Sequence, residues 1–178
     1  MSSKLMIAVS GKSGCGNTSA SRIVAEKLGL RLINYTFHDF AEELGIPFEE
    51  LLERAKTDSS YDLELDRKQV ALARAGGCVL GSRLAIWLLK EADLKVYLTA
   101  SPEKRTERIA KREKRPIAAI LEETVQRDAN DHVRFMKLYN IDNDAFQFAD
   151  FIVDTEKGDE NYVAGQILSR LAEKNLIG

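Results

Sequence analysis

Short apolar runs alternate with longer amphipathic stretches along this chain. Unbroken apolar runs are typical of strands that are buried on both faces of a parallel sheet. The stretches between them carry apolar residues at three- and four-residue spacing and end near glycine or proline, which predicts helices. The strands that we expect lie at 5–10, 30–34, 78–80, 94–99 and 151–153.

The helices that we expect lie at 18–28, 37–44, 48–55, 61–75, 84–90, 117–139 and 161–176, with one more that begins after Ser101. Strands that alternate with helices predict an α/β fold, in which helices flank a five-stranded parallel sheet. The length of 178 residues suits one domain with its own core, so we expect a single domain over residues 1–178. Ligands of such sheets bind at the carboxyl ends of the strands.

A glycine-rich turn joins the first expected strand to the first helix. Its sequence, Gly-Lys-Ser-Gly-Cys-Gly-Asn-Thr-Ser over residues 11–19, is called the phosphate loop below. In such a turn, backbone N–H groups converge on a phosphate and the helix N-terminus adds positive potential. We therefore predict ATP binding by Gly11, Ser13, Gly14, Cys15, Gly16, Asn17, Thr18 and Ser19, with the Thr18 hydroxyl as a ligand of Mg²⁺.

One position of the phosphate loop departs from the common pattern, which places lysine after the last glycine. Asn17 stands there, and its amide can donate a hydrogen bond but brings no charge. Lys12, inside the loop, either swings inward to replace the missing charge or points to solvent. The sequence leaves both arrangements open.

Three groups of arginines follow. Arg83 comes just after the third expected strand, where its planar guanidinium suits a phosphate. Arg108 and Arg112 share a helix face before Pro116, and an arginine-rich loop there could close over a substrate. Spacings of four and three place Arg127, Asp131 and Arg134 on one face of the next helix. The alternative for each group is a solvated surface.

Composition narrows the function classes. The net charge of −2 gives no electrostatic footprint for nucleic acid, and no apolar run is long enough to span a membrane. The two cysteines form neither a disulfide framework nor a zinc motif. We therefore expect a cytoplasmic monomer that binds neither nucleic acid nor membrane. His38 and His132 lack the neighbours of a hydrolase triad.

The order of the motifs resembles the cytidylate kinases, especially the short archaeal type. The segments that carry this resemblance are the phosphate loop, Gly-Ser-Arg-Leu-Ala-Ile-Trp (81–87), Ala-Asp-Leu-Lys-Val-Tyr-Leu-Thr-Ala-Ser (92–101), Glu-Arg-Ile-Ala-Lys-Arg-Glu (107–113) and Arg-Asp-x-x-Asp-x-x-Arg (127–134). The resemblance implies a P-loop kinase core with a lid at about 108–118 and a helical insertion at about 35–75 that binds the monophosphate. The implied reaction transfers the γ-phosphoryl group of ATP to CMP or dCMP, with Mg²⁺.

The resemblance also implies roles for individual residues. Arg83 and Arg134 would hold the acceptor phosphate, and Asp131 with Arg127 would read cytosine or bind phosphate. Arg108 and Arg112 would be lid arginines. We predict these two as catalytic cations together with Lys12, which is the candidate in the loop itself to replace the missing lysine. Thr36 and His38 would contact the acceptor after the second strand, where the family usually offers an arginine.

Two other functions stay open from the sequence. Asn17 favours a weak or inactive nucleotide-binding protein of the same fold, whereas the arginines that remain favour turnover. The changes around His38 and beside Arg83 favour a kinase for another small acceptor.

Overall fold

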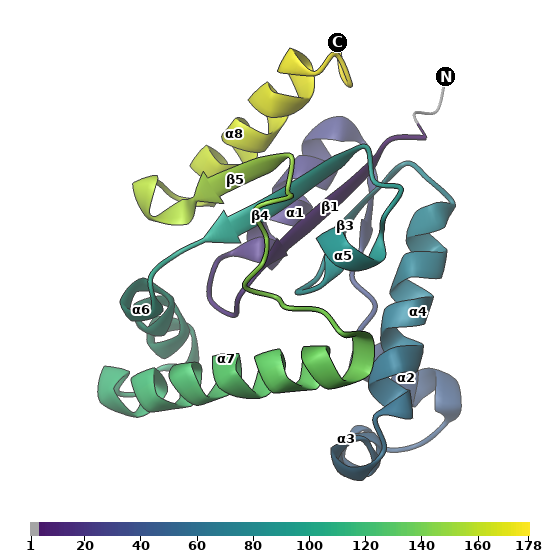
Figure 1. Cartoon of the computed structure of the whole chain (residues 1–178), viewed down its shortest axis with the longest axis vertical. Coiled ribbons are helices and arrows are strands. Elements are labelled where there is room, and N and C mark those ends of the chain that lie inside the picture. The colour runs from purple at the N-terminus through teal and green to yellow at the C-terminus, as the bar shows by residue number, and fades with distance from the viewer. Residues whose placement is uncertain (1–3) are drawn as a thin grey trace.

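Five parallel strands form the centre of the fold in the computed structural model, which describes residues 4–178 (Figure 1). The strand order is β2-β3-β1-β4-β5. The strands are β1 (Met6–Gly11), β2 (Arg31–Ile33), β3 (Cys78–Gly81), β4 (Leu94–Thr99) and β5 (Phe151–Asp154). This arrangement confirms the five-stranded parallel sheet that the apolar runs predict.

Helices cover both faces of the sheet. On one face, α1 (Asn17–Leu28) and α8 (Glu160–Glu173) pack a large apolar core against β1 and β4. On the other face, α4 (Ser60–Arg74) and the short α5 (Ala85–Leu88) pack a second core. Because both faces are buried, the central strands can be apolar throughout, which is why their sequences lack a polar alternation.

A small helical unit stands apart from the sheet, beside one end of α4 (Figure 1). It consists of α2 (Phe37–Leu44) and α3 (Phe48–Thr57), and its core of Phe40, Ala41 and Leu51 is separate from those of the sheet. A capping box at Thr36 begins α2, since the Thr36 hydroxyl accepts from the Asp39 N–H and the Asp39 carboxylate accepts from the Thr36 N–H.

Two helices, α6 (Pro102–Glu113) and α7 (Ile117–Tyr139), follow β4 and lie below the sheet in Figure 1. Ile109 and Ala110 of α6 pack on Ile120 of α7. The chain reverses between them at 114–116, where Lys114 has a left-handed backbone with φ 54°. A 3₁₀ turn, η1 (Thr155–Lys157), follows β5.

The element boundaries correct several expectations. Helix α6 continues to Glu113, so Arg112 lies in its last turn and not in the loop that we expected. The helix expected at 84–90 is shorter, and the last helix ends at Glu173. Among residues 4–178, no helix has the length and apolar character needed to cross a membrane.

Candidate active site

The phosphate loop wraps around a small cavity at the carboxyl end of β1. Gly14 and Gly16 both have a φ of 85°, which only glycine adopts readily. A Cβ on Gly14 would also lie 2.9 Å from the Cβ of Arg105. Both the backbone conformation and the lack of space therefore require glycine at this position. The cavity has a volume of about 250 Å³ and is completed by 81–83 and Arg112. None of its lining residues in the described part of the chain carries a carboxylate, which suits an anion.

Asn17 turns its side chain toward the protein backbone. Its Nδ2 donates to the carbonyl oxygen of Val9 at 3.0 Å and to that of Ser82 at 3.3 Å. The Ser21 hydroxyl donates to Asn17 Oδ1 at 3.0 Å. Both amide protons are thus used, and the side chain ties the end of β1 to the loop after β3. Asn17 lines the phosphate cavity, but in this arrangement its amide has no proton left for a phosphate.

Gly81 leaves room for this tie. A Cβ on Gly81 would lie 2.6 Å from the Ser21 hydroxyl and 3.0 Å from Asn17 Oδ1. The Ser82 N–H also donates to the Val9 carbonyl oxygen, at 3.1 Å. The loop that carries Arg83 is therefore fastened directly to the phosphate loop.

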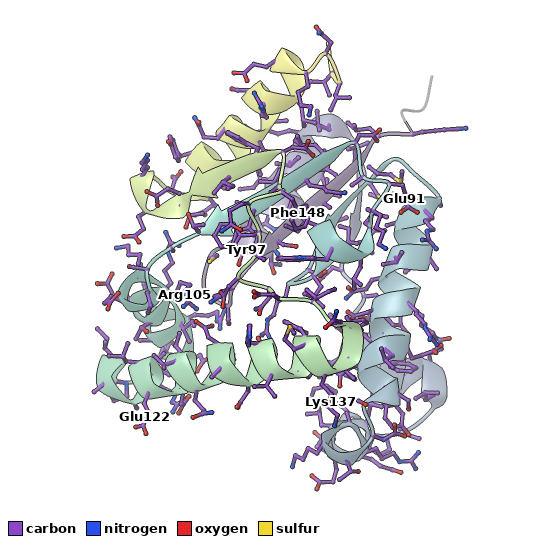
Figure 2. The ribbon with its side chains drawn as sticks, viewed as in Figure 1. Glu91, Tyr97, Arg105, Glu122, Lys137 and Phe148 are labelled. Atoms are coloured by element: carbon purple, nitrogen blue, oxygen red, sulfur yellow. The ribbon has the colours of Figure 1, made fainter. Side chains whose placement is uncertain are left out.

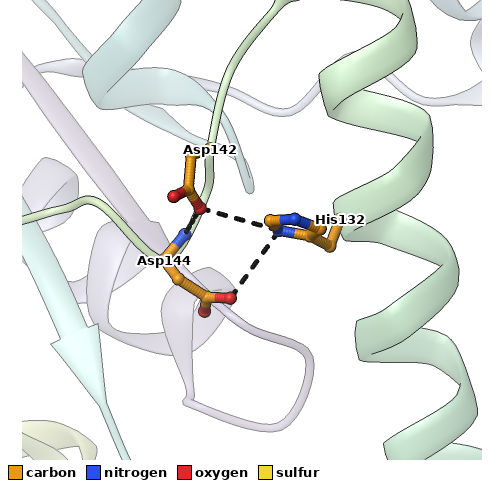
Figure 3. A group of neighbouring side chains, drawn as sticks. All are labelled: His132, Asp142 and Asp144. Atoms are coloured by element: carbon orange, nitrogen blue, oxygen red, sulfur yellow. Dashed lines mark hydrogen bonds and ion pairs between the residues drawn. The ribbon is translucent and has the colours of Figure 1, made fainter.

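Lys12 adopts neither arrangement that the sequence left open. Its Nζ lies 2.6 Å from Asp144 Oδ1, on the loop after α7. Asp144 belongs to a polar cluster in which His132 Nδ1 lies 3.7 Å from Asp144 Oδ2 and 3.6 Å from Asp142 Oδ1 (Figure 3). His132 Nδ1 also lies 3.2 Å from Asn143 Oδ1. The ammonium of Lys12 is thus paired with a carboxylate at the edge of the phosphate loop.

Two arginines of α6 hold the phosphate loop from behind. Arg105 is 2% exposed; it donates to the Ser13 carbonyl oxygen at 3.1 Å and makes a forked pair with Asp128 at 3.1 and 2.5 Å (Figure 2). Arg108 donates to the Gly14 carbonyl oxygen at 3.3 Å, and to the hydroxyl and carbonyl oxygens of Thr155 at 2.8 and 2.6 Å. Both guanidiniums therefore hold the backbone of the phosphate loop in place. They also stand close to the Cys15 thiol, whose pKa burial raises.

Arg112 differs from these two arginines. It is exposed at the end of α6, and its partner is the neighbouring Glu113 at 3.4 Å. It borders the phosphate cavity and also a larger cavity of about 560 Å³ between α6, the phosphate loop and the start of α8. The larger cavity is open beside Gly14 and Gly16, so it can receive the rest of a nucleotide whose phosphates lie in the loop.

An ion-pair chain joins Arg83 to α7. Asp131 is buried and accepts from Arg83 Nη1 at 2.6 Å and from Arg134 Nη2 at 3.0 Å. Arg134 Nη1 also donates to Asp62 of α4 at 3.2 Å. Burial lowers the pKa of Arg83, and the charge of Asp131 opposes that shift. Each oxygen of Asp131 accepts from one arginine, so this carboxylate orients the two guanidiniums, and lone pairs remain on both oxygens for a further donor.

A third cavity of about 340 Å³ opens beside Arg83 and Arg134. Asp62 and Asp66 of α4 line it, and burial raises the pKa of both carboxyl groups. The Tyr139 hydroxyl, at the end of α7, donates to Asp66. The cavity therefore has cations at one end and acceptor groups along one wall.

Comparisons with known proteins show the family of this chain. The model of the cytidylate kinase-like family matches residues 6–157. The chain belongs to this family. It is 44% identical to cytidylate kinase 2 of Borreliella afzelii, over 97% of this chain and 99% of that protein. It is 35% identical to the cytidylate kinase of Methanocaldococcus jannaschii, over 87% and 90% of the two chains.

A likeness of fold extends beyond the family. The structure of shikimate kinase from Acinetobacter baumannii, in complex with shikimate, superposes with a TM-score of 0.66 at 19% identity. The alignment covers 97% of this chain and 96% of that kinase. This likeness is one of fold, and it confirms the α/β fold with a five-stranded parallel sheet that the sequence predicts.

Within this family member, the structure brings together most of the residues that the sequence singled out. Thr18 and Ser19 border the phosphate cavity, and Arg127 Nη1 donates to the Ser13 hydroxyl at 3.2 Å. Thr36 and His38 lie elsewhere. The Thr36 side chain caps α2, and the His38 ring stacks on Phe48 at a centroid distance of 3.5 Å, outside the cavity beside Arg83.

Several residues beside these cavities could not be assigned from the sequence. For Asp62 and Asp66 of the long helix before the third strand, the sequence left open a wall of the substrate site or a plain surface, because one helix face fits both. The spacing of Arg105 places it on one helix face with Arg108 and Arg112, but its pairing with Asp128 spans two helices and could not be seen in the sequence. The helical spacing of Asp62, Asp66 and Gln69 was the signal that could have found this wall, since all three border one cavity.

Proposed function

We propose that this protein transfers the γ-phosphoryl group of ATP to CMP or dCMP, giving ADP and CDP or dCDP. The observation that carries this proposal is the alignment of three cavities. The phosphate cavity shares Gly14, Gly16 and Arg112 with the larger cavity, and it shares Ser82 and Arg83 with the third. A donor nucleotide and an acceptor can therefore meet end to end at the phosphate loop, as direct transfer requires.

The donor occupies the larger cavity and the phosphate loop. The backbone N–H groups of 13–18 and the N-terminus of α1 attract its phosphates. Thr18 borders the phosphate cavity with an exposed side chain that has no hydrogen-bond partner among residues 4–178, so its hydroxyl fits a Mg²⁺ that arrives with ATP. When bound, Mg²⁺ bridges phosphate oxygens and neutralises their charge. The cavity lining offers no carboxylate, so Thr18, the phosphates and water would hold the ion.

The acceptor occupies the third cavity with its phosphate toward Arg83 and Arg134. Asp131 orients both guanidiniums, so they present fixed donors to the phosphate oxygens. Arg127, held by the Ser13 hydroxyl, stands between the acceptor and the phosphate loop. Its charge lies where negative charge builds up during transfer.

Asp62, Asp66 and Gln69 read the base. Gln69 Nε2 donates to the Tyr35 carbonyl oxygen at 2.7 Å, which leaves its side-chain oxygen as an acceptor. Cytosine carries an amino group, a hydrogen-bond donor, where uracil carries a carbonyl oxygen. A wall of acceptors therefore favours cytosine and rejects uracil by leaving polar groups unpaired.

The charge missing at Asn17 is supplied by arginines. Arg83 and Arg112 border the phosphate cavity from opposite sides, and Arg127 reaches its rim through Ser13. Lys12 is the fourth cation, and it contributes when a phosphate competes with Asp144 for its ammonium. Asn17 itself is a positioning residue. We place the reaction in the cytoplasm, because both cysteines are free, buried thiols and the substrates are soluble nucleotides.

An acceptor screen tests this function. We expect ADP release, measured by a coupled assay, with CMP and dCMP, and much less with UMP, AMP or unphosphorylated cytidine and shikimate. Turnover only with an unphosphorylated acceptor would favour a kinase for another small molecule. ATP binding without turnover on any acceptor would contradict both kinase functions and favour an inactive nucleotide-binding protein.

A further inference from the structure

Helix α7 is apolar on two opposite sides. Its inner side buries Ile120, Thr124, Asp131 and Phe135. Its outer side exposes three large apolar residues: Val125, Val133 and Met136. A surface helix normally carries one apolar stripe, and a second stripe is typical of a helix that packs on something else.

The centre of this outer stripe is self-complementary. Val125 is 56% exposed and Val133 is 66% exposed, and each lies four residues from the exposed Ala129. Residues four apart lie one above the other on a helix, so these three share one face. The small Ala129 between two valines leaves room for a second helix to cross closely at that point.

Two charges of opposite sign flank the stripe. Glu122 lies seven residues before Ala129, and Lys137 lies eight residues after it. Figure 2 shows both on the side of α7 that faces away from the sheet. Among residues 4–178, neither side chain has an ion-pair or hydrogen-bond partner. They lie roughly 22 Å apart along the helix, at a rise of 1.5 Å per residue, so they cannot pair within one chain.

We propose that α7 is a homodimer interface, in which it packs antiparallel on α7 of a second copy around a two-fold axis at Ala129. In that arrangement Val125 packs on Val133 of the partner subunit, and the reciprocal contact follows from the symmetry. Glu122 reaches Lys137 of the partner subunit. A parallel arrangement would instead bring like charges together, so the charge pattern selects the antiparallel one.

The dimer joins two active sites through one helix pair. Arg127, Asp131 and Arg134 lie on the inner side of α7, opposite the apolar stripe. Pairing on the outer side therefore fixes the helix that holds the acceptor arginines. One helix pair is a small interface, so association is reversible and depends on concentration. The proposal does not depend on the proposed reaction.

Sedimentation of the full chain tests the proposal. We expect the mass to rise with concentration from 19.9 kDa toward twice that value. Val133→Asp should leave a monomer at every concentration, with an unchanged circular dichroism spectrum because the residue is exposed. The matched control is Leu72→Asp, at a 44% exposed apolar position of α4, which should dimerise like the wild type.

Charge exchange tests the antiparallel register. Glu122→Lys and Lys137→Glu should each weaken the dimer by roughly tenfold, because two symmetry-related pairs become repulsive. The double variant should recover wild-type affinity, since each new lysine again meets a glutamate of the partner. A monomeric wild type would overturn the dimer and support the monomer predicted from the sequence. Failure of the double variant to recover would overturn this register.

Discussion

At the scale of single residues, Asn17 occupies the position where the common phosphate-loop pattern places a lysine, and its side chain holds two loops together. Its amide joins the Val9 and Ser82 carbonyl oxygens, and Gly81 lacks a side chain where that amide lies. The tie links the strand that precedes the phosphate loop to the loop that carries Arg83. The identity of residue 17 therefore bears on acceptor binding more than on ATP binding.

The variant Asn17→Asp tests this role with almost no change of shape. It replaces the donating amide by oxygen, so both hydrogen bonds from residue 17 to the carbonyl oxygens of Val9 and Ser82 are lost, at a net cost of about 0.5–1.5 kcal/mol for each bond. We expect KM for CMP to rise about tenfold and KM for ATP to change much less, measured by steady-state kinetics. Asn17→Lys should not raise kcat, because a lysine breaks the same tie.

The opposite pattern would assign Asn17 to the donor phosphates. A large rise in KM for ATP alone in Asn17→Asp, together with a gain of turnover in Asn17→Lys, would show that a lysine role is merely unfilled. Ser21→Ala is the control, because it removes the Ser21 donor and leaves the two bonds from Asn17 Nδ2 in place.

We expect kcat/KM for CMP to depend on pH through the carboxyl group of Asp66. Burial raises the pKa of Asp66 above the ordinary value of 3.8. The carboxylate must be ionised to accept from the cytosine amino group without competition from its own proton. We therefore expect kcat/KM for CMP to fall on acidification through this raised pKa, and Asp66→Asn to be slower and to lose that part of the profile. An unchanged acid limb in the variant would assign the limb to another group.

The burial of Asp66 also affects the stability of the folded protein. A carboxyl group whose pKa is raised by folding favours the folded state when protonated, so its contribution is lost as pH rises through the raised pKa. Asp66→Asn avoids that loss and should raise Tm at neutral pH while lowering activity. A lower Tm would show that the bond from Tyr139 outweighs the desolvation of the carboxylate.

At the scale of elements, α6 and α7 form a clamp on the phosphate loop. The pair of Arg105 and Asp128 joins the two helices, and Arg105 also holds the Ser13 carbonyl oxygen. Arg105 packs against Gly14, where a Cβ would lie 2.9 Å from the Arg105 Cβ. The clamp thus sets the shape of the loop that binds phosphate.

Removal of Asp128, the partner of the buried Arg105, should lower the free energy of unfolding far more than removal of one partner of an ion pair at the surface. Asp128→Ala leaves a buried guanidinium without its carboxylate, and we expect the free energy of unfolding to fall by about 3 kcal/mol. Glu123→Ala removes the exposed pair with Arg115 and should cost less than about 1 kcal/mol. Urea denaturation of both variants checks the difference. Equal losses would show that Asp128 is not part of a buried clamp.

The boundaries of these elements were predictable only where local chemistry sets them. Pro116 begins α7, whose predicted range matches the observed one from Ile117 to Tyr139. The basic run before Pro116 looked like a loop, but α6 continues through it until Lys114 takes a left-handed backbone. Charged side chains are compatible with helix and loop alike, so this boundary could not be placed from the sequence.

At the scale of the whole molecule, the fold was more predictable than the site. Apolar strands and a continuous phosphate motif are local signals, and they predicted the sheet and the donor loop. The cavity beside Arg83 and Arg134 depends on contacts between distant segments, such as Arg134 with Asp62 and Tyr139 with Asp66. The spacing of Asp62, Asp66 and Gln69 in α4 places them on one helix face, but only the contacts with α7 show that this face lines a cavity.

The three adjoining cavities imply that the donor and acceptor nucleotides meet at Arg83. The phosphoryl group then passes directly from one to the other. The most direct test follows the label from γ-³²P-ATP in the presence of CMP. We predict labelled CDP with wild-type protein, and a loss of about 10²-fold or more in Arg83→Met, on the scale of one lost preorganised donor. Labelled inorganic phosphate without labelled CDP, or equal transfer by Arg83→Met, would contradict the account.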